Sequence, residues 1–169
     1  MLVGDTSAFV SLAVGGVFTP TTEAFEIATT RQVLDELEQT GQYDDRHGTA
    51  AAAVLAHRDD FTMLSTDPEP FITSRIDRGE ASCVVATHEL DATCLVTDDF
   101  RALPELQELI TADVVLSPIV IRALSKQAAI SDETAQAAFD TIAEDRDWLG
   151  APIDRYAKTL FDESDSSHG

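Results

Sequence analysis

Two short apolar runs in this chain each end directly in acidic residues. Leu2–Gly4 runs into Asp5, and Cys94–Thr97 runs into the pair Asp98 and Asp99. Helical patterns separate these runs, and strands that alternate with helices are typical of a parallel sheet covered on both faces. Ligands of such sheets bind beyond the carboxyl ends of the strands. We therefore expect Asp5 and Asp98 to share that edge of the sheet.

The rest of the chain repeats this alternation. Strands are expected at 1–3, 25–28, 61–64, 92–96 and 113–116, and helices at 8–14, 30–41, 47–57, 79–90, 104–110, 118–125, 131–148 and 153–161. We expect Thr6 or Ser7 to cap the first helix, Thr29 or Thr30 to cap the second, and Gly150 to end the long one. The pattern predicts an α/β fold, a three-layer α/β/α sandwich with a central, mainly parallel sheet of four or five short strands.

The chain of 169 residues is long enough for one domain with a sizeable core. We expect a single domain over 1–161, with a core at 1–116 and a C-terminal helical part at 117–161. Residues 162–169 are polar and are expected to form a disordered acidic tail. One helical face is apolar and is either core or the surface of a homodimer: Ala135, Ala138, Phe139 and Ile142.

The charge of the chain is extreme, at −20, with 31 acidic against 11 basic residues spread along the whole length. Such a surface suits a halophile, since concentrated salt screens the repulsion between like charges. Few basic residues argue against a nucleic-acid partner, although bound metal ions would reverse the local sign of charge.

Two cysteines and the apolar pattern bear on the compartment. Cys83 and Cys94 are expected to be buried free thiols, as is usual for cysteine outside disulfides. We expect no secretory leader, because the first apolar run reaches Asp5 without a basic segment before it, and no apolar stretch is long enough to span a bilayer. We expect a cytoplasmic protein that has no membrane partner.

Four acidic positions lie where a parallel α/β sheet gathers side chains: Asp5, Glu36, Glu80 and the pair Asp98-Asp99. Carboxylates that converge at strand ends bind hard divalent cations, and such sites usually perform phosphate chemistry. A simpler interpretation stays open for each residue. Asp5 could cap a helix, Asp98 and Asp99 could be turn residues, and Glu80 could be a first-turn acid favoured by the helix dipole. Glu36 could be a solvated helix residue.

Four motifs in this order resemble those of the PIN-domain nucleases over about residues 1–116. They are Val3-Gly4-Asp5-Thr6-Ser7-Ala8-Phe9, Val33-Leu34-Asp35-Glu36-Leu37, Arg78-Gly79-Glu80-Ala81-Ser82 and Leu95-Val96-Thr97-Asp98-Asp99-Phe100-Arg101-Ala102-Leu103. The helices beyond residue 116 resemble the family more loosely. Thr29-Thr30 stands where relatives commonly carry a proline, so Asp35 remains the alternative to Glu36 as the second acid.

The resemblance implies an endoribonuclease that uses Mg²⁺ or Mn²⁺ to hydrolyse single-stranded RNA. It also implies the toxin of a toxin–antitoxin pair, with an antitoxin protein as partner, and a homodimer. Asp5 and Asp98 would be the main metal ligands, Glu36 and Glu80 would hold metal-bound water or a second ion, and Asp99 would be an additional ligand.

Other side chains near these acids are candidates for substrate contact. Thr6, Ser7 and Thr97 would hydrogen-bond a phosphate or orient a ligand carboxylate. The candidates for RNA phosphate contacts are Arg31, Arg75, Arg78 and Arg101.

Two other functions remain open. A PIN-like binding or scaffold module that cleaves little would suit the acidic surface. An aspartyl-phosphate phosphatase would use Asp5 as nucleophile, but that family has a second Asp where this chain has Ser7.

Overall fold

The computed structural model describes residues 1–148, 151–152, 155–156 and 158–159, and in this part of the chain five parallel strands form one central sheet. The sheet has the order β3-β2-β1-β4-β5. Its strands are β1 (Leu2–Gly4), β2 (Ile27–Thr30), β3 (Thr62–Leu64), β4 (Cys94–Val96) and β5 (Asp113–Val115). The expected tail at 162–169, the expected helix end at Gly150 and part of the expected helix at 153–161 lie outside the described residues.

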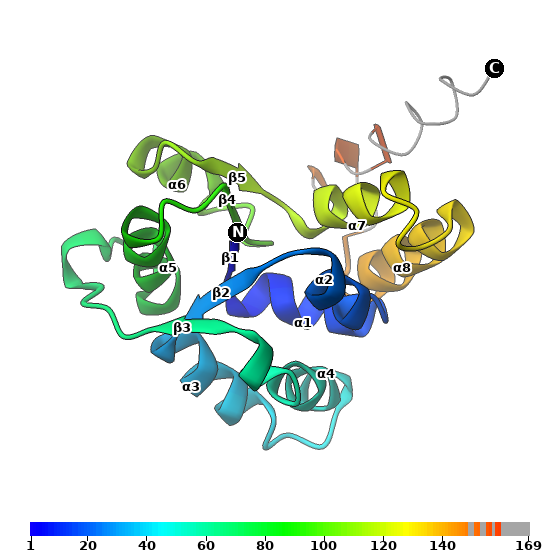
Figure 1. Cartoon of the computed structure of the whole chain (residues 1–169), viewed down its shortest axis with the longest axis horizontal. Coiled ribbons are helices and arrows are strands. Elements are labelled where there is room, and N and C mark those ends of the chain that lie inside the picture. Colours follow the sequence, from blue (N-terminus) through cyan, green and yellow to red (C-terminus); the bar gives the residue numbers. More distant parts are fainter. Residues whose placement is uncertain (149–150, 153–154, 157, 160–169) are drawn as a thin grey trace.

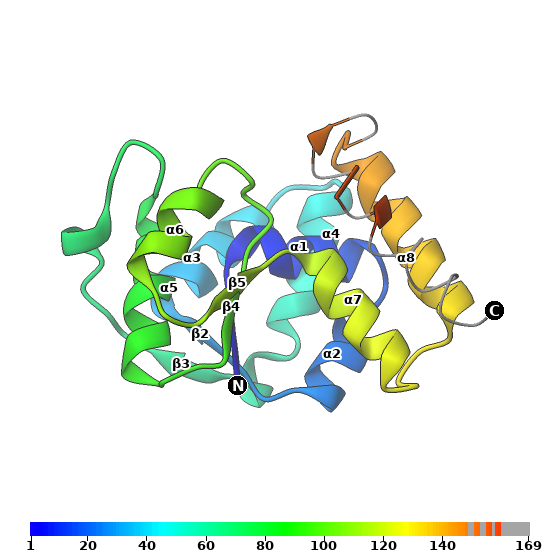
Figure 2. The ribbon, with the colours of Figure 1, turned by 90° about the horizontal axis from the view of Figure 1, so that it is seen from above.

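Helices cover both faces of this sheet, which confirms the expected three-layer fold (Figures 1 and 2). The helices are α1 (Thr6–Val14), α2 (Phe18–Ala24), α3 (Arg31–Thr40), α4 (Arg46–Leu55), α5 (Arg78–Glu89), α6 (Leu103–Leu109), α7 (Ser117–Lys126) and α8 (Asp132–Asp145), with short 3₁₀ turns at Arg58–Asp60 and Glu69–Phe71. Helices α5 and α6 lie on one face, and α1, α2, α7 and α8 lie on the other. Helix α4 packs against α1 and α3. No described helix is both long and apolar enough to cross a membrane.

The strand register sets up the edge where the acidic residues gather. Gly4 at the end of β1 lies opposite Val96 at the end of β4, and the Asp5 amide continues the ladder with a 3.1 Å bond to the Val96 carbonyl. Because all strands run the same way, their following residues emerge together at one edge. Asp5 and Thr97 are thereby neighbours, and Asp98 follows Thr97 at the same edge of the sheet, where it was expected beside Asp5.

Two local expectations, the cap of α1 and the bounds of β2, need correction. Asp5, rather than Thr6 or Ser7, caps α1, because its extended backbone lets its carboxylate accept the Ala8 amide. Strand β2 begins at Ile27 and continues to Thr30, two residues beyond the expected 25–28, and Thr30 then caps α3 as predicted.

Helix α8 ends at Asp145, earlier than the expected boundary at 148. Asp147 has a positive φ of 56°, and the Trp148 amide bonds back to the Ala143 carbonyl over 2.8 Å. A left-handed residue combined with this return bond is a common helix-ending turn. The turn buries Trp148 and holds Arg146 beside α1.

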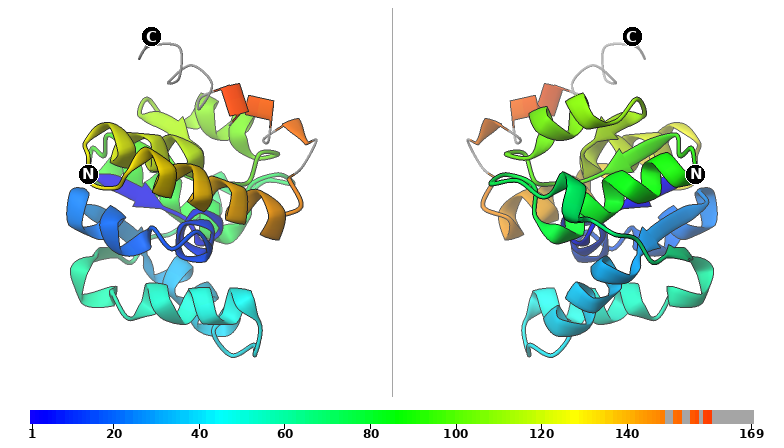
Figure 3. Two further views of the ribbon diagram at one scale, coloured as in Figure 1. Left: turned by 90° about the vertical axis from the view of Figure 1, so that its right-hand side faces the viewer. Right: turned by 90° about the vertical axis from the view of Figure 1, so that its left-hand side faces the viewer.

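The apolar face of α8 belongs to the core. Its four residues are all at least 97% buried, and α8 packs on both α1 and α7 (Figure 3, left). The apolar face is thus not available as a dimer surface, and the homodimer rests on the resemblance alone. Cys83 and Cys94 are buried free thiols, as expected.

Truncation of Ile142 should show whether the apolar face of α8 belongs to the core of one chain or to a dimer interface. Ile142→Ala removes a fully buried side chain, so we expect the free energy of unfolding to fall by about 2 to 5 kcal/mol. Urea denaturation measures this loss, which should not depend on protein concentration. Ile72→Ala, at a side chain that is 37% exposed, should change stability by less than about 1 kcal/mol. A loss for Ile142→Ala that shrinks on dilution would instead indicate a dimer interface.

Candidate functional site

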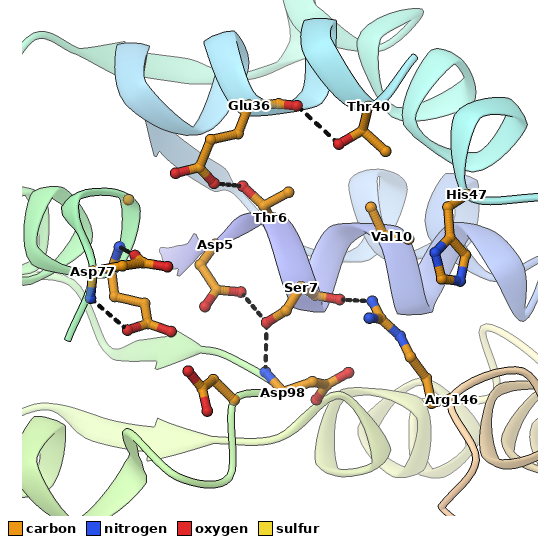
Figure 4. Close-up of a pocket in the computed structure, with 13 residues that line it drawn as sticks. Asp5, Thr6, Ser7, Val10, Glu36, Thr40, His47, Asp77, Asp98 and Arg146 are labelled. Atoms are coloured by element: carbon orange, nitrogen blue, oxygen red, sulfur yellow. Dashed lines mark hydrogen bonds between the residues drawn. The ribbon is translucent and has the colours of Figure 1, made fainter. Parts of the chain in front are cut away.

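A pocket of about 420 Å³ opens at the carboxyl edge of the sheet, where β1 and β4 end (Figure 4). Segments far apart in the chain supply its walls: the start of α1, the middle of α3, the start of α5, the residues after β4, and the turn after α8. Six carboxylates line it, and five of them are expected site residues: Asp5, Glu36, Asp77, Glu80, Asp98 and Asp99. The structure therefore brings the sequence-derived acids into one place.

Asp5 is the most deeply buried of these acids, at 4% exposed. Its Oδ1 accepts the Ser7 hydroxyl at 2.7 Å and the Ala8 amide at 2.9 Å, and its Oδ2 accepts the Thr97 hydroxyl. Burial raises the pKa of Asp5 to about 7, against the opposing effect of these hydrogen bonds and with a contribution from the nearby Asp98 charge. Asp5 is both a helix cap and a pocket acid, so its two interpretations are compatible.

Asp98 is tied to two helix starts. Its amide donates to Ser7 Oγ at 3.0 Å, and its Oδ1 accepts the Ser117 amide at the start of α7 at 2.7 Å. Its Oδ2 is buried and has no hydrogen-bond partner among the described residues. Burial raises the pKa of Asp98, while hydrogen bonding from Ser11 and Ser117 and, to a smaller degree, the positive charge of Arg146 oppose the shift. A buried carboxylate oxygen without a partner calls for a proton, a water or a cation.

Glu36 reaches the pocket from α3 and lies against the start of α5. Its Oε2 accepts the Thr6 hydroxyl, and a Cβ on Gly79 would stand only 2.3 Å from its Oε1. Gly79 therefore leaves room for this carboxylate, whose pKa is raised by burial. Asp35 faces solvent and pairs with Arg31 at 3.5 Å. The second acid of the pocket is thus Glu36, and the alternative Asp35 is excluded by its position.

Glu80 starts α5 in a reciprocal cap with Asp77. The Glu80 amide donates to Asp77 Oδ1 at 2.8 Å, and the Asp77 amide donates to Glu80 Oε2 at 3.1 Å. Burial raises the pKa of Glu80 well above its usual range, with further contributions from a hydrogen bond to the Asp99 carboxyl and from the Asp77 charge. Asp77 was not among the expected site residues, although an Asp three residues before a Glu is a recognised capping signal.

The hydroxyl groups near these acids orient carboxylates. Thr6 donates to Glu36, while Ser7 and Thr97 donate to Asp5. Two roles were expected for Thr6, Ser7 and Thr97, and the structure has the one in which the hydroxyl group orients a carboxylate. None of the three hydroxyl protons is left for a phosphate in this arrangement.

The four candidate arginines do not line the pocket. Arg101 is exposed, and only its backbone amide bonds Asp99. Three others pair with carboxylates: Arg31 with Asp35 at 3.5 Å, Arg75 with Glu105 at 3.9 Å and Arg78 with Glu69 at 2.6 Å. Their nearness to the acids in sequence did not bring them to the pocket.

Besides Asp77, the unexpected lining residues include two basic ones, Arg146 and His47. Arg146 follows α8 and bonds Ser7 and Ser11 of α1. His47 lies in the first turn of α4, and its Nε2 is 2.7 Å from Asp145 Oδ2. No local pattern singles out either residue, because both reach the pocket through the packing of distant helices.

The pocket suits a hard cation by its chemistry, although no three described His, Cys, Asp or Glu side chains meet in a group that could hold one as they stand. Its donors are carboxylate oxygens, and Oδ2 of Asp98 accepts no hydrogen bond from the residues that the structure describes. Mg²⁺ keeps several of its waters and needs only one or two direct carboxylates. A cation would also relieve the repulsion that contributes to the raised pKa values. The donor types are therefore those that Mg²⁺ and Mn²⁺ prefer, and the binding of either ion here stays a prediction.

Comparison with family models, with curated proteins and with solved structures finds no match to this chain. The functional assignment consequently depends on the pocket and its chemistry.

The buried Asp5 carboxyl predicts an unusual pH dependence for the metal-free protein. Between the ordinary aspartate pKa of 3.8 and about 7, the folded state binds more protons than the unfolded state, so stability falls as pH rises through this window. Asp5 contributes up to about 4 kcal/mol to this loss. Asp5→Asn should flatten the dependence in urea titrations with EDTA, whereas the exposed Asp44→Asn should leave it unchanged. An equally steep fall in Asp5→Asn would contradict this assignment.

Gly79→Ala should separate stability from ion binding. The new methyl group displaces the flexible Glu36 carboxylate, and alanine favours the helix by up to about 1 kcal/mol, so the Tm without metal should hold or rise. The rise in Tm on adding Mn²⁺ should shrink, because one pocket acid has moved. Glu36→Gln and the double variant Gly79→Ala/Glu36→Gln should show the same reduced rise, since both changes act through one carboxylate. Additive losses would place the effect of Gly79 elsewhere.

Proposed function

We propose that this protein is a metal-dependent endoribonuclease of the PIN type, which hydrolyses phosphodiester bonds of single-stranded RNA with Mg²⁺ or Mn²⁺. The observation that carries the proposal is the convergence of Asp5, Glu36, Glu80 and Asp98 on one pocket at the carboxyl edge of a parallel sheet. These acids follow the order of the PIN motifs along the chain. Convergence from separate segments is not expected of acids that serve only to hydrate a surface.

Each acid has a distinct environment, and this suggests a division of roles. Asp5 and Asp98 lie closest to the two central strand ends and would hold the ion. When bound, Mg²⁺ or Mn²⁺ supplies an activated water and neutralises charge on the phosphate. Glu80 and Glu36, whose pKa values are raised by burial, would hold or accept protons near the attacking and leaving oxygens.

The hydroxyl network supports this role by fixing the acids before a substrate arrives. Ser7 bonds both the Asp5 carboxylate and the Asp98 amide, and Thr97 holds the second Asp5 oxygen. Ligand carboxylates that are themselves hydrogen-bonded keep one orientation. The same bonds disfavour the phosphatase, because both oxygens of Asp5 already accept hydrogen bonds and Ser7 stands where a second Asp would be needed.

The acidic walls themselves argue for a required cation. A phosphodiester cannot approach six carboxylates without a positive charge between them. The volume of about 420 Å³ is within the usual range of small-ligand pockets. We therefore propose that RNA enters only the metal-loaded pocket. We further propose that the protein acts in the cytoplasm, and that an antitoxin protein and a second copy of the chain are its partners.

Neighbouring acids on α3 provide the sharpest test of the proposal. Glu36→Gln should lower Mn²⁺-dependent cleavage of labelled single-stranded RNA roughly 100-fold, about 3 kcal/mol of transition-state stabilisation. Asp35→Asn makes the same change of charge one residue away, at an exposed side chain, and should cleave like wild type. Fluorescence from an internally quenched oligonucleotide follows the rate in concentrated KCl.

Asp5→Asn should also lose cleavage, together with the Mn²⁺-dependent rise in Tm. Wild-type protein that binds Mn²⁺ yet leaves RNA intact would favour the binding or scaffold module. Equal cleavage by Glu36→Gln and Asp35→Asn would refute the proposed site.

A further inference from the structure

The pocket has two electrostatically different ends. Figure 4 shows Asp5, Asp77 and Glu36 toward one end, and Arg146 and His47 at the other. The carboxylates give the first end its negative potential. The second end contains the guanidinium of Arg146, although the chain as a whole carries a charge of −20.

Asp145, beside Arg146 in sequence, is engaged elsewhere. Its Oδ2 lies 2.7 Å from His47 Nε2, and its Oδ1 lies 3.5 Å from Arg46 Nη1. Within the described part of the chain, no carboxylate oxygen lies within 4.0 Å of a side-chain nitrogen of Arg146, although the Arg146 charge still acts on the Asp98 carboxylate. This sets Arg146 apart from the paired arginines of the surface.

The guanidinium of Arg146 is held in place from one side. Its Nε donates to Ser11 Oγ at 3.1 Å, and its Nη2 donates to the Ser7 carbonyl at 2.8 Å. A guanidinium has five N–H donors, and bonds to the described residues use two of them, which leaves three donors that no described residue accepts. The side chain is partly buried and lines the pocket, where these donors are available to a ligand.

Ser7 links this cation to the acidic end. Its carbonyl accepts Arg146, while its hydroxyl bonds the Asp5 carboxylate and the Asp98 amide. One residue of α1 thus fixes the guanidinium relative to the two proposed ion-binding carboxylates. A planar cation at a set position beside a cation site suits the next phosphate of a polynucleotide backbone.

We propose that Arg146 is a phosphate-binding residue, which holds the backbone phosphate adjacent to the one at the acidic end and so selects a single-stranded polynucleotide over a mononucleotide. This inference rests on the proposed nuclease function. A purely structural role, in which Arg146 only ties α8 to α1, would give no dependence on the phosphates of a ligand.

Binding of a fluorescein-labelled hexauridylate, followed by anisotropy with Ca²⁺ in place of Mg²⁺ to separate binding from cleavage, tests the inference. Arg146→Gln should weaken binding about tenfold, the loss of one charge-assisted contact. It should also lower the slope of log K against log salt by about 0.7, the value for one phosphate on a single strand. Arg31→Gln removes the same charge from an exposed arginine away from the pocket, and should change neither quantity.

A second set of ligands tests the inference on wild-type protein, so that the test does not depend on whether the Arg146→Gln variant folds. Hexauridylates in which one phosphate at a time is a neutral methylphosphonate should lose about tenfold affinity for wild type at the position that Arg146 contacts. Arg146→Gln should lose nothing further at that position. If melting curves show that Arg146→Gln is unfolded, Arg146→Lys is tested in its place. A methylphosphonate substitution that costs Arg146→Lys less affinity than wild type at that one position supports the inference. The same loss of affinity as in wild type at every position overturns it.

The outcomes separate this inference from the proposed function. Cleavage by wild type with an unchanged salt slope in Arg146→Gln would overturn the phosphate contact and leave the nuclease intact. An Arg146-dependent slope without cleavage under Mn²⁺ would support the contact and refute the nuclease. Wild type that binds no hexauridylate would overturn the inference.

Discussion

The carboxylate of Asp5 is the point on which the rest of the site depends. Asp5 ends β1, continues the ladder with β4 through its amide, and caps α1 through its side chain. The hydroxyl groups of Ser7 and Thr97 donate to the same carboxylate, and Ser7 Oγ also accepts the Asp98 amide. One buried acid therefore joins two strands to a helix, and the hydrogen bonds it accepts offset only part of the cost of its burial, as its raised pKa shows.

Acids gathered in this way are unfavourable for the metal-free fold. Burial raises the pKa of Asp5, Glu36, Glu80 and Asp98 alike, so each ionised carboxylate opposes folding near neutral pH. The absence of a Cβ at Gly79 leaves space for Glu36 but gives up helix propensity. Strain of this kind, concentrated in one pocket and compensated by a well-packed core, is characteristic of functional sites rather than of structural ion pairs.

The exposed arginines and the pocket arginine, Arg146, have different hydrogen-bond and ion-pair partners. On the surface, carboxylates surround the basic residues, and Arg31, Arg58 and Arg78 each pair with an acid. Exposed pairs of this kind contribute little to stability, but they leave those guanidinium groups less available to RNA. Arg146 donates to a carbonyl and a hydroxyl, which are neutral acceptors, and its charge acts on the pocket carboxylate of Asp98. Strong acidity therefore does not exclude a polyanionic substrate at this one place.

Sequence patterns predicted the alternation of strands and helices, the parallel sheet and the acids that follow β1 and β4, because hydrophobic periodicity and strand ends are local properties of the chain. They could not choose Glu36 over Asp35, since adjacent helical residues differ only in the direction that packing gives them. Nor could they find Arg146, which meets Ser7 across 139 residues of chain, or foresee that Thr97 would serve Asp5. Only the tertiary structure decided these contacts, because each depends on how helices from distant segments dock on one edge of the sheet.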